Sequence, residues 1–384
     1  MLVETLIKRK YAIDIAKMEF VISESPGWHK IEAVDNNTKV SWLSIPDIEV
    51  HYGASKIMVG GIAGVYTPRE FRGKGYSAST LNYAIEWMRN RGYALSELFG
   101  IQEYYHRFGF ATFMGEHTVT ISLRDASRIE AREYEWEISD DPSFCANDIA
   151  NIYEETNANW ITSRVRKPNE WNGFRKGVSW EHTPKVLVIR SGKQVFGYAA
   201  IERWANPDEL LVAEVGAKSN DKEVYRALLK NLFKLALEEK KSRIRIHVPP
   251  DHEIVNVLRP YGISIESTFL WSGGGMARVI NLTKLLKDIE VELAERSKGV
   301  TGEASLEIPG ESATIKVNDG EVRITQGSSS INKVKMDPGE TAQLILGYRE
   351  PEELLSKVEA YGEPGVLVRL FPLKTPYVWQ PDRW

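Results

Sequence analysis

The chain has 384 residues, more than one hydrophobic core usually serves, so we expect two or three domains. Its composition, 42% hydrophobic and 27% charged, is that of a folded protein rather than a disordered one. A formal net charge of −4, with basic and acidic residues interspersed, argues against a nucleic-acid-binding protein. The single cysteine cannot form an internal disulfide, and no apolar run is long enough to span a bilayer. A soluble cytoplasmic protein with no membrane partner is expected.

The first segment, residues 1–125, alternates strand and helix patterns. Runs of β-branched and aromatic residues predict strands at 39–45, 48–53 and 57–67. Apolar residues at helical spacing then predict a helix over 77–92. Further along, we expect a strand at 93–100, a short helix at 103–110 and a strand at 116–123.

The middle segment, residues 126–281, repeats this order of elements. Strands are expected at 185–190, 194–204 and 209–217, an amphipathic helix at 221–241, a strand at 243–249 and a helix at 252–263. A loop with paired glycines and an arginine precedes the helix of the first segment, whereas the corresponding stretch here reads GAKSNDKEVY, residues 216–225. We therefore expect a second copy of one architecture that lacks the glycine loop.

The last segment, residues 282–384, has a different pattern. Leucine and isoleucine residues line one face of a predicted helix over 282–299. We expect strands at 304–308, in a hairpin at 313–325 and at 367–373, and helices at 340–347 and 351–362. These patterns predict a small α+β domain. The fold class expected for the whole chain is mixed α/β and α+β, in three domains.

The loop RGKG, Arg72 to Gly75, joins a predicted strand to a predicted helix. Amides at a helix N-terminus lack partners, and the helix dipole favours an anion there. The two glycines would let the backbone approach a pyrophosphate, while Arg72 and Lys74 would add positive charge. A plain tight turn with solvated basic neighbours is the alternative that the loop alone leaves open.

The same loop matches the pattern Arg-x-x-Gly-x-Gly/Ala at Arg72, Gly75 and Ser77, with serine where glycine or alanine is usual. It resembles the coenzyme A loop of the GCN5-related N-acetyltransferases, the GNAT superfamily. The resemblance implies that acetyl-CoA is the cosubstrate, that the preceding strand pairs with its pantetheine arm, and that the loop binds its pyrophosphate. The residues expected to bind the cosubstrate are Val65, Tyr66, Thr67, Arg72, Gly73, Lys74, Gly75, Tyr76 and Ser77.

The segment YYHRFGF, residues 104–110, resembles a short helix of the same superfamily that reads Phe-Tyr-x-x-x-Gly-Phe. The resemblance implies that Tyr105 protonates the departing coenzyme A thiolate. A phenol with a pKa of ~10 keeps its proton at neutral pH and can still deliver it to a developing thiolate. The alternative is a tyrosine that only packs on a helix face.

The C-terminal segment FPLKTPYVWQPDRW, residues 371–384, is aromatic and proline-rich where a chain end is usually polar and frayed. With the three-part plan, it resembles the Eis-like acetyltransferases, which have an active GNAT domain, a degenerate GNAT-like domain and a domain similar to sterol carrier proteins. The resemblance implies that the α-carboxylate of Trp384 is the general base, and that the protein forms a homo-oligomer, with a hexamer expected. A tail that only holds the third domain on the first is the alternative.

Other candidate sites are few. Seven scattered histidines and the lack of a cysteine pair predict no metal site. Cys145 has no activating base near it in sequence and is interpreted as a packing residue. Trp28 and His29 lie where an acceptor pocket is expected, but the segment before residue 39 is short for the family, so no acceptor residue is transferred from it.

The function expected is that of an enzyme, an acetyl-CoA-dependent N-acetyltransferase that transfers acetyl directly to an amine. The partner would be a small-molecule or peptide acceptor of the aminoglycoside, polyamine or lysine class. Two alternatives remain: a lipid or acyl carrier, based on the sterol-carrier likeness, and a scaffold without catalytic activity. An intact loop and Tyr105 beside a degenerate copy argue against the scaffold.

Overall fold

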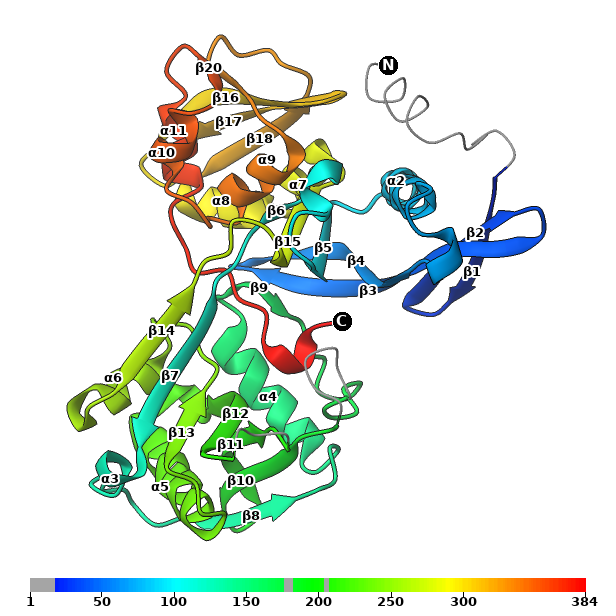
Figure 1. Ribbon diagram of the computed structural model, residues 1–384. Coiled ribbons are helices and arrows are strands. Elements are labelled where there is room, and N and C mark those ends of the chain that lie inside the picture. Colours follow the sequence, from blue (N-terminus) through cyan, green and yellow to red (C-terminus); the bar gives the residue numbers. More distant parts are fainter. Residues whose placement is uncertain (1–17, 176–181, 204–206) are drawn as a thin grey trace.

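The computed structural model describes residues 18–175, 182–203 and 207–384. These residues form three β-sheets with helices packed on them; the third sheet lies above the first and the second lies below it (Figure 1). The expected mixed α/β class with several sheets is confirmed. Residues 1–17, which begin the expected first domain, and residue 204, which ends one expected strand, lie outside the described residues.

The first sheet has the strand order β1-β2-β3-β4-β5-β15-β6, and β9 also pairs with β3. Its strands are β1 (Glu19–Ser25), β2 (Trp28–Asp35), β3 (Thr38–Tyr52), β4 (Ser55–Tyr66), β5 (Leu95–Gly100), β6 (Ala111–Thr112), β9 (Ile161–Arg164) and β15 (Gly274–Val279). Among these strands only β4 and β5 pair in parallel. A parallel pair needs a crossover, which here consists of the 3₁₀ turn η2 (Arg69–Phe71) and helix α2 (Tyr76–Arg91).

The second sheet repeats this plan, with the order β14-β7-β13-β12-β11-β10-β8. Its strands are β7 (Glu116–Ser122), β8 (Glu135–Ser139), β10 (Lys185–Ser191), β11 (Gln194–Ile201), β12 (Glu209–Ala217), β13 (Arg243–Ile246) and β14 (Ser264–Thr268). β12 and β13 pair in parallel, and η4 (Lys218–Asn220) and α5 (Lys222–Glu238) connect them. The other helices of this part are α3 (Leu123–Ala126), α4 (Ala146–Asn157), α6 (Glu253–Leu258) and η5 (Arg259–Tyr261).

Two strands are exchanged between these sheets. β7, assigned above to the first segment, pairs with β13 and β14 of the second sheet. β15, from the middle segment, pairs with β5 and β6 of the first sheet. The boundaries expected after residues 125 and 281 therefore do not separate the sheets. A sequence pattern identifies a strand but not its partner, so the exchange could not be read from it.

The third sheet has the order β18-β17-β16-β19-β20. Its strands are β16 (Thr301–Ile308), β17 (Glu311–Asn318), β18 (Glu321–Gln326), β19 (Lys333–Lys335) and β20 (Glu359–Tyr361), and its helices are α7 (Leu282–Asp288), α8 (Glu290–Arg296), α9 (Pro338–Ile345), α10 (Pro351–Leu355) and α11 (Gly365–Leu370). Three expectations were wrong here. The predicted helix over 351–362 ends at Leu355, and residues 359–361 form strand β20. The predicted helix over 282–299 breaks at Ile289, and the predicted strand over 367–373 is mostly helix α11, whose Leu367 and Leu370 are buried.

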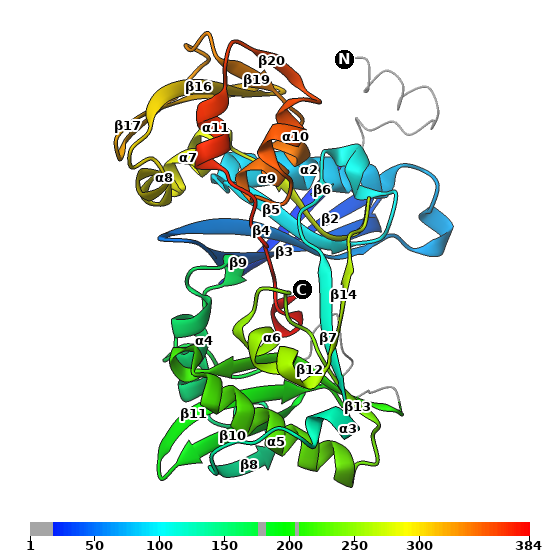
Figure 2. The same ribbon diagram turned by 90° about the vertical axis from the view of Figure 1, so that its left-hand side faces the viewer.

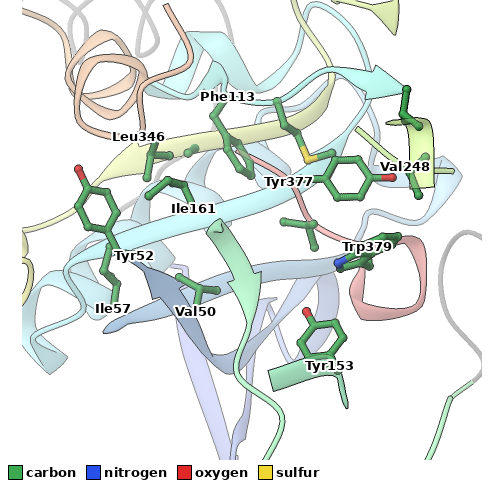
Figure 3. Close-up of a cluster of buried hydrophobic side chains, with 14 of the residues drawn as sticks. Val50, Tyr52, Ile57, Phe113, Tyr153, Ile161, Val248, Leu346, Tyr377 and Trp379 are labelled. Carbon is green, nitrogen blue, oxygen red and sulfur yellow. The ribbon is translucent and has the colours of Figure 1, made fainter. Parts of the chain in front are cut away.

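All three parts share one buried cluster (Figure 3). Tyr52 of β3 donates a hydrogen bond of 2.5 Å to the carbonyl of Ile345 in α9, so the first and third parts are joined by more than apolar contact. Tyr377 and Trp379 of the C-terminal segment are each 1% exposed. This segment runs from the third sheet down between the first and second sheets (Figure 2). None of the helices in the described parts of the chain has the length and apolar character that a membrane span requires.

Candidate active site

The first sheet opens between its two parallel strands. β4 and β5 are paired through four register positions, the last of which joins Ile62 to Leu98. Beyond this point β5 continues beside β15, whereas β4 continues to Tyr66 beside β3. Residues 63–66 therefore have no partner on their β5 side among the described strands. A free strand edge of this kind can bind an extended ligand through its backbone groups.

The loop between β4 and α2 has the backbone of an anion site. Gly73 and Gly75 have φ values of +75° and +89°, a left-handed conformation that favours glycine, and Gly75 is the N-cap of α2. A Cβ atom added at Gly73 would meet nothing within 4 Å, so the loop is open there. In the described part of the chain, no group accepts a hydrogen bond from the amides of residues 73–78. These amides begin a helix of 16 residues, and its dipole also favours a bound anion.

Some side chains of this loop are free to bind a ligand, and others stabilise the fold. Arg72 and Lys74 are exposed, and Arg72 donates from Nε to the carbonyl of Thr67 at 3.0 Å. Tyr76 instead points into the core, where its hydroxyl donates to Asp35 at 2.5 Å. That hydrogen bond, with burial, raises the pKa of Tyr76 to about 12. Of the residues expected to bind the cosubstrate, Tyr76 therefore offers only its amide.

Tyr105 lies on the α2 side of the opening. It begins the 3₁₀ turn η3 (Tyr105–Phe108), and its ring covers the end of β5: a Cβ atom on Gly100 would come within 2.5 Å of the ring. Its side chain is 9% exposed and packs in the cluster that contains Met88 of α2. Burial, and to a lesser degree Tyr104, raises the pKa of Tyr105 to about 12. The phenol therefore keeps its proton throughout the neutral range.

Trp384 lies on the opposite face of the same opening. Its ring packs edge-on against Phe99, with 5.3 Å between centroids, and a Cβ atom on Gly61 would lie 2.5 Å from its Nε1. Successive residues of a strand point to opposite faces, so Phe99 and the adjacent Gly100 serve opposite sides of β5. The last residue of the chain and Tyr105 thus approach the point where β4 and β5 separate from opposite sides.

Glu97 is a candidate that the sequence analysis missed. It is fully buried on β5, opposite Gly61 of β4 and on the same face as Phe99. Neither of its carboxylate oxygens has a hydrogen-bond partner among the described residues, and neither does Nε1 of Trp384. Burial raises the pKa of Glu97 to about 8. The only signal in the sequence is an acidic residue within the apolar strand LSELFG, which reads equally well as a solvent-facing position.

Glu97→Gln should change how stability depends on pH. The carboxyl pKa is near 4.5 in an unfolded chain and about 8 in the folded one. Between these values only the folded state binds the proton, so the unfolding free energy falls as the pH rises through this window. Thermal unfolding at about pH 5 and about pH 9 should show the variant gaining roughly 2–5 kcal/mol on the parent chain at the higher pH. An equal difference at both pH values would show that Glu97 is not buried without a partner.

The other candidate residues lie on different faces of the first sheet or outside it. Trp28 is in register with Pro46 on β3, and a Cβ atom on Gly61 would also touch the Pro46 ring. Trp28, which is 45% exposed, therefore lies on the face that carries Trp384. His29 faces the other way, with its ring 4.9 Å from that of Trp87 on α2. Cys145 is the N-cap of α4 in the second part, consistent with a packing residue.

Comparison with protein families identifies the segment that contains this opening. Residues 25–113 match the model of the acetyltransferase (GNAT) domain. This segment is similar to that domain. It holds the strand edge at 63–66, the glycine loop and Tyr105, whereas Trp384 lies outside it. The predicted enzyme class, an N-acetyltransferase that depends on acetyl-CoA, is confirmed by this match. A search of curated protein sequences found no significant match.

Solved structures are similar to nearly the whole chain, not only to residues 25–113. A conserved protein of unknown function from Enterococcus faecalis V583, described as a probable N-acyltransferase, has a TM-score of 0.74 at 17% identity, over 94% of this chain and 90% of that one. A GCN5-related N-acetyltransferase from Anabaena variabilis ATCC 29413 has a TM-score of 0.71 at 16% identity, over 92% and 89%. Eis1 from Mycobacterium abscessus has a TM-score of 0.64 at 17% identity, over 92% and 90%. At such identities the likeness shows a shared fold. The expected resemblance to an Eis protein is confirmed at that level.

Proposed function

We propose that the protein transfers the acetyl group of acetyl-CoA directly to a primary amine at the opening between β4 and β5. The observation that carries this proposal is the placement of Tyr105 and Trp384 on opposite faces of one opening, beside a loop with unpaired amides. A donor held on the α2 face would present its thioester to an acceptor that arrives from the other face.

The described residues fit acetyl-CoA as this donor. Val65, Tyr66 and Thr67 would pair with the pantetheine arm through their backbone groups, since this edge of β4 is free on the β5 side. The amides of residues 73–77 and the charges of Arg72 and Lys74 would bind the diphosphate, with Ser77 near the turn that carries Tyr105: its Oγ lies 2.6 Å from the hydroxyl of Tyr104.

The reaction needs two proton transfers, and we assign one group to each. The amine must lose a proton to attack the thioester carbon, and the α-carboxylate of Trp384 would accept it. As the carbon–sulfur bond breaks, the thiolate needs a proton, which the Tyr105 hydroxyl would supply. Its pKa of about 12 means that the phenol is protonated before each turnover, and solvent reprotonates it afterwards.

The acceptor face carries a carboxyl group that could bind an amine. Glu97 and the ring of Trp384 both lie on it, and the buried carboxyl of Glu97 has no hydrogen-bond partner among the described residues. Polyamines, aminoglycosides and lysine side chains all satisfy this chemistry, and none is favoured over the others. The sterol-carrier likeness of the third part and the homo-oligomer stay predictions from the family resemblance.

The test of this function is thiol release from acetyl-CoA across a panel of polyamines, aminoglycosides and lysine peptides. We expect release that depends on the added amine, together with an acetylated product detected by mass spectrometry. Acetyl-CoA that binds but is turned over with none of these amines would contradict direct transfer to this acceptor class.

A further inference from the structure

The second sheet has an opening like that of the first. β12 and β13 run parallel through four register positions that end at Val212 and Ile246, and β12 then continues to Ala217 beside β11, with no partner on its β13 side among the described strands. Gly197 of β11 faces α5, since a Cβ atom there would touch Val224 of that helix. The opposite face, which carries Tyr198, packs against α4. The crossover helix thus covers one face in both sheets, and the C-terminal segment lies on the opposite face, which in the second sheet it shares with α4.

The C-terminal segment binds in this second opening through a buried ion cluster, the Arg166 network. Arg166 follows β9 and is 1% exposed. Its two terminal nitrogens each contact one oxygen of Glu214 at 2.6 Å, and its Nη2 and Nε contact Asp382 at 2.8 and 3.2 Å. The hydroxyl of Tyr153 donates to Asp382 at 3.1 Å, and that of Tyr198 donates to Glu214 at 2.7 Å. Every charged group in the network is therefore paired.

This network fixes the position of Asp382 near the end of the chain. Burying charges costs free energy unless their partners and geometry are complete, so a displaced Asp382 would leave Arg166 short of a partner in an apolar interior. Two neighbouring hydrogen bonds also hold the C-terminal segment in place. Trp379 donates from Nε1 to Asn157 at 2.7 Å, and Gln380 donates to Nδ1 of His247, just beyond β13, at 3.1 Å.

The held residue is close in sequence to the terminal carboxylate. Only Arg383 separates Asp382 from Trp384, and Arg383 is itself paired with Glu116 at 2.9 Å. Two residues span at most ~7 Å, so the place of Asp382 in the second opening limits where the carboxylate of Trp384 can lie at the first.

We propose that the second sheet fixes the position of the C-terminal residues, and that Asp382 is a positioning residue for the terminal carboxylate. The inference rests on the proposed role of that carboxylate. The C-terminal segment thus contacts both openings, with Asp382 at the second and Trp384 at the first.

Asp382→Asn is the sharpest test, because Arg166 keeps its bidentate partner Glu214 and the folded chain loses one charge only. We expect kcat to fall at least about 10-fold, the Kd of acetyl-CoA to stay within about 2-fold, and carboxypeptidase to release Trp384 at least about 10-fold faster. Asp251→Asn is the matched control, since Asp251 contacts Thr375 in an exposed part of the same segment at 3.1 Å. It should leave all three quantities unchanged.

A second variant protects the test against a folding defect. Tyr153→Phe removes one hydroxyl from the network and keeps the ring, and it should raise the release rate about 3-fold. Wild-type release rates in both Asp382→Asn and Tyr153→Phe would overturn the proposal, as would an unchanged kcat in Asp382→Asn. Failure of the proposed function would look different: the parent chain itself would show no amine-dependent thiol release, while the release of Trp384 would still respond to Asp382→Asn.

Discussion

Tyr105→Phe is expected to lower kcat by about 10²–10³-fold while the Kd of acetyl-CoA changes by less than about 3-fold. The variant removes the proton that the thiolate would receive, but it keeps the ring that packs beside Gly100 and 6.4 Å from Phe110, measured between centroids. Steady-state thiol release gives kcat, and calorimetry gives the affinity. A variant with the parent kcat would contradict the acid role.

The adjacent tyrosine supplies a matched control. Tyr104 lies in the same turn, contacts the Tyr105 ring at 5.0 Å and differs in its hydroxyl partner, which is Ser77. Tyr104→Phe should lower kcat by less than about 5-fold. A loss as large as that of Tyr105→Phe would mean that the turn as a whole, rather than one phenol, is being perturbed.

Adding one glycine after Trp384 is expected to lower kcat by about 10²–10³-fold with no change in the melting temperature. The extension moves the free carboxylate by one residue, about 3.8 Å, which is more than a proton transfer tolerates. Stability should be kept because the buried groups of the tail, Trp379 and Asp382, are untouched.

Trp384→Phe separates the carboxylate from the indole. It keeps the terminal carboxylate and removes the indole, whose buried Nε1 has no hydrogen-bond partner in the described part of the chain. We expect kcat within about 10-fold of the parent chain, well above that of the extended chain. Full activity in the extended chain would show that another group removes the amine proton, and Glu97, buried on the same sheet face, would be the first to test.

Local patterns predicted the elements around the site well. The strand before the loop, helix α2 and the short turn at Tyr105 each depend on neighbouring residues, and all are present. Where the patterns failed, distant contacts decided the outcome. Pro46 was expected to separate two strands, yet β3 continues through it, because Pro46 pairs with Trp28 and has no register partner on β4. Helix α11 read as a strand because it is short and apolar on both sides.

Only the part of the site near the loop and Tyr105 could be predicted from the sequence. The loop and Tyr105 belong to contiguous motifs, so a single sequence reveals them. Arg166 and Asp382 lie 216 residues apart and read separately as ordinary surface charges; only the path of the tail brings them together. Glu97 was missed for a related reason, since Trp384, at the other end of the chain, lies against Gly61, the register partner of Glu97.

The most direct test of the central claim, that the loop at residues 72–77 binds the diphosphate of acetyl-CoA, is titration calorimetry of the purified protein with acetyl-CoA. We predict saturable binding at one site per chain, weakened at least about 10-fold in Arg72→Gln, because that variant removes a charged donor exposed at the loop. No heat of binding in the parent chain, or equal affinity in the two proteins, would contradict the account.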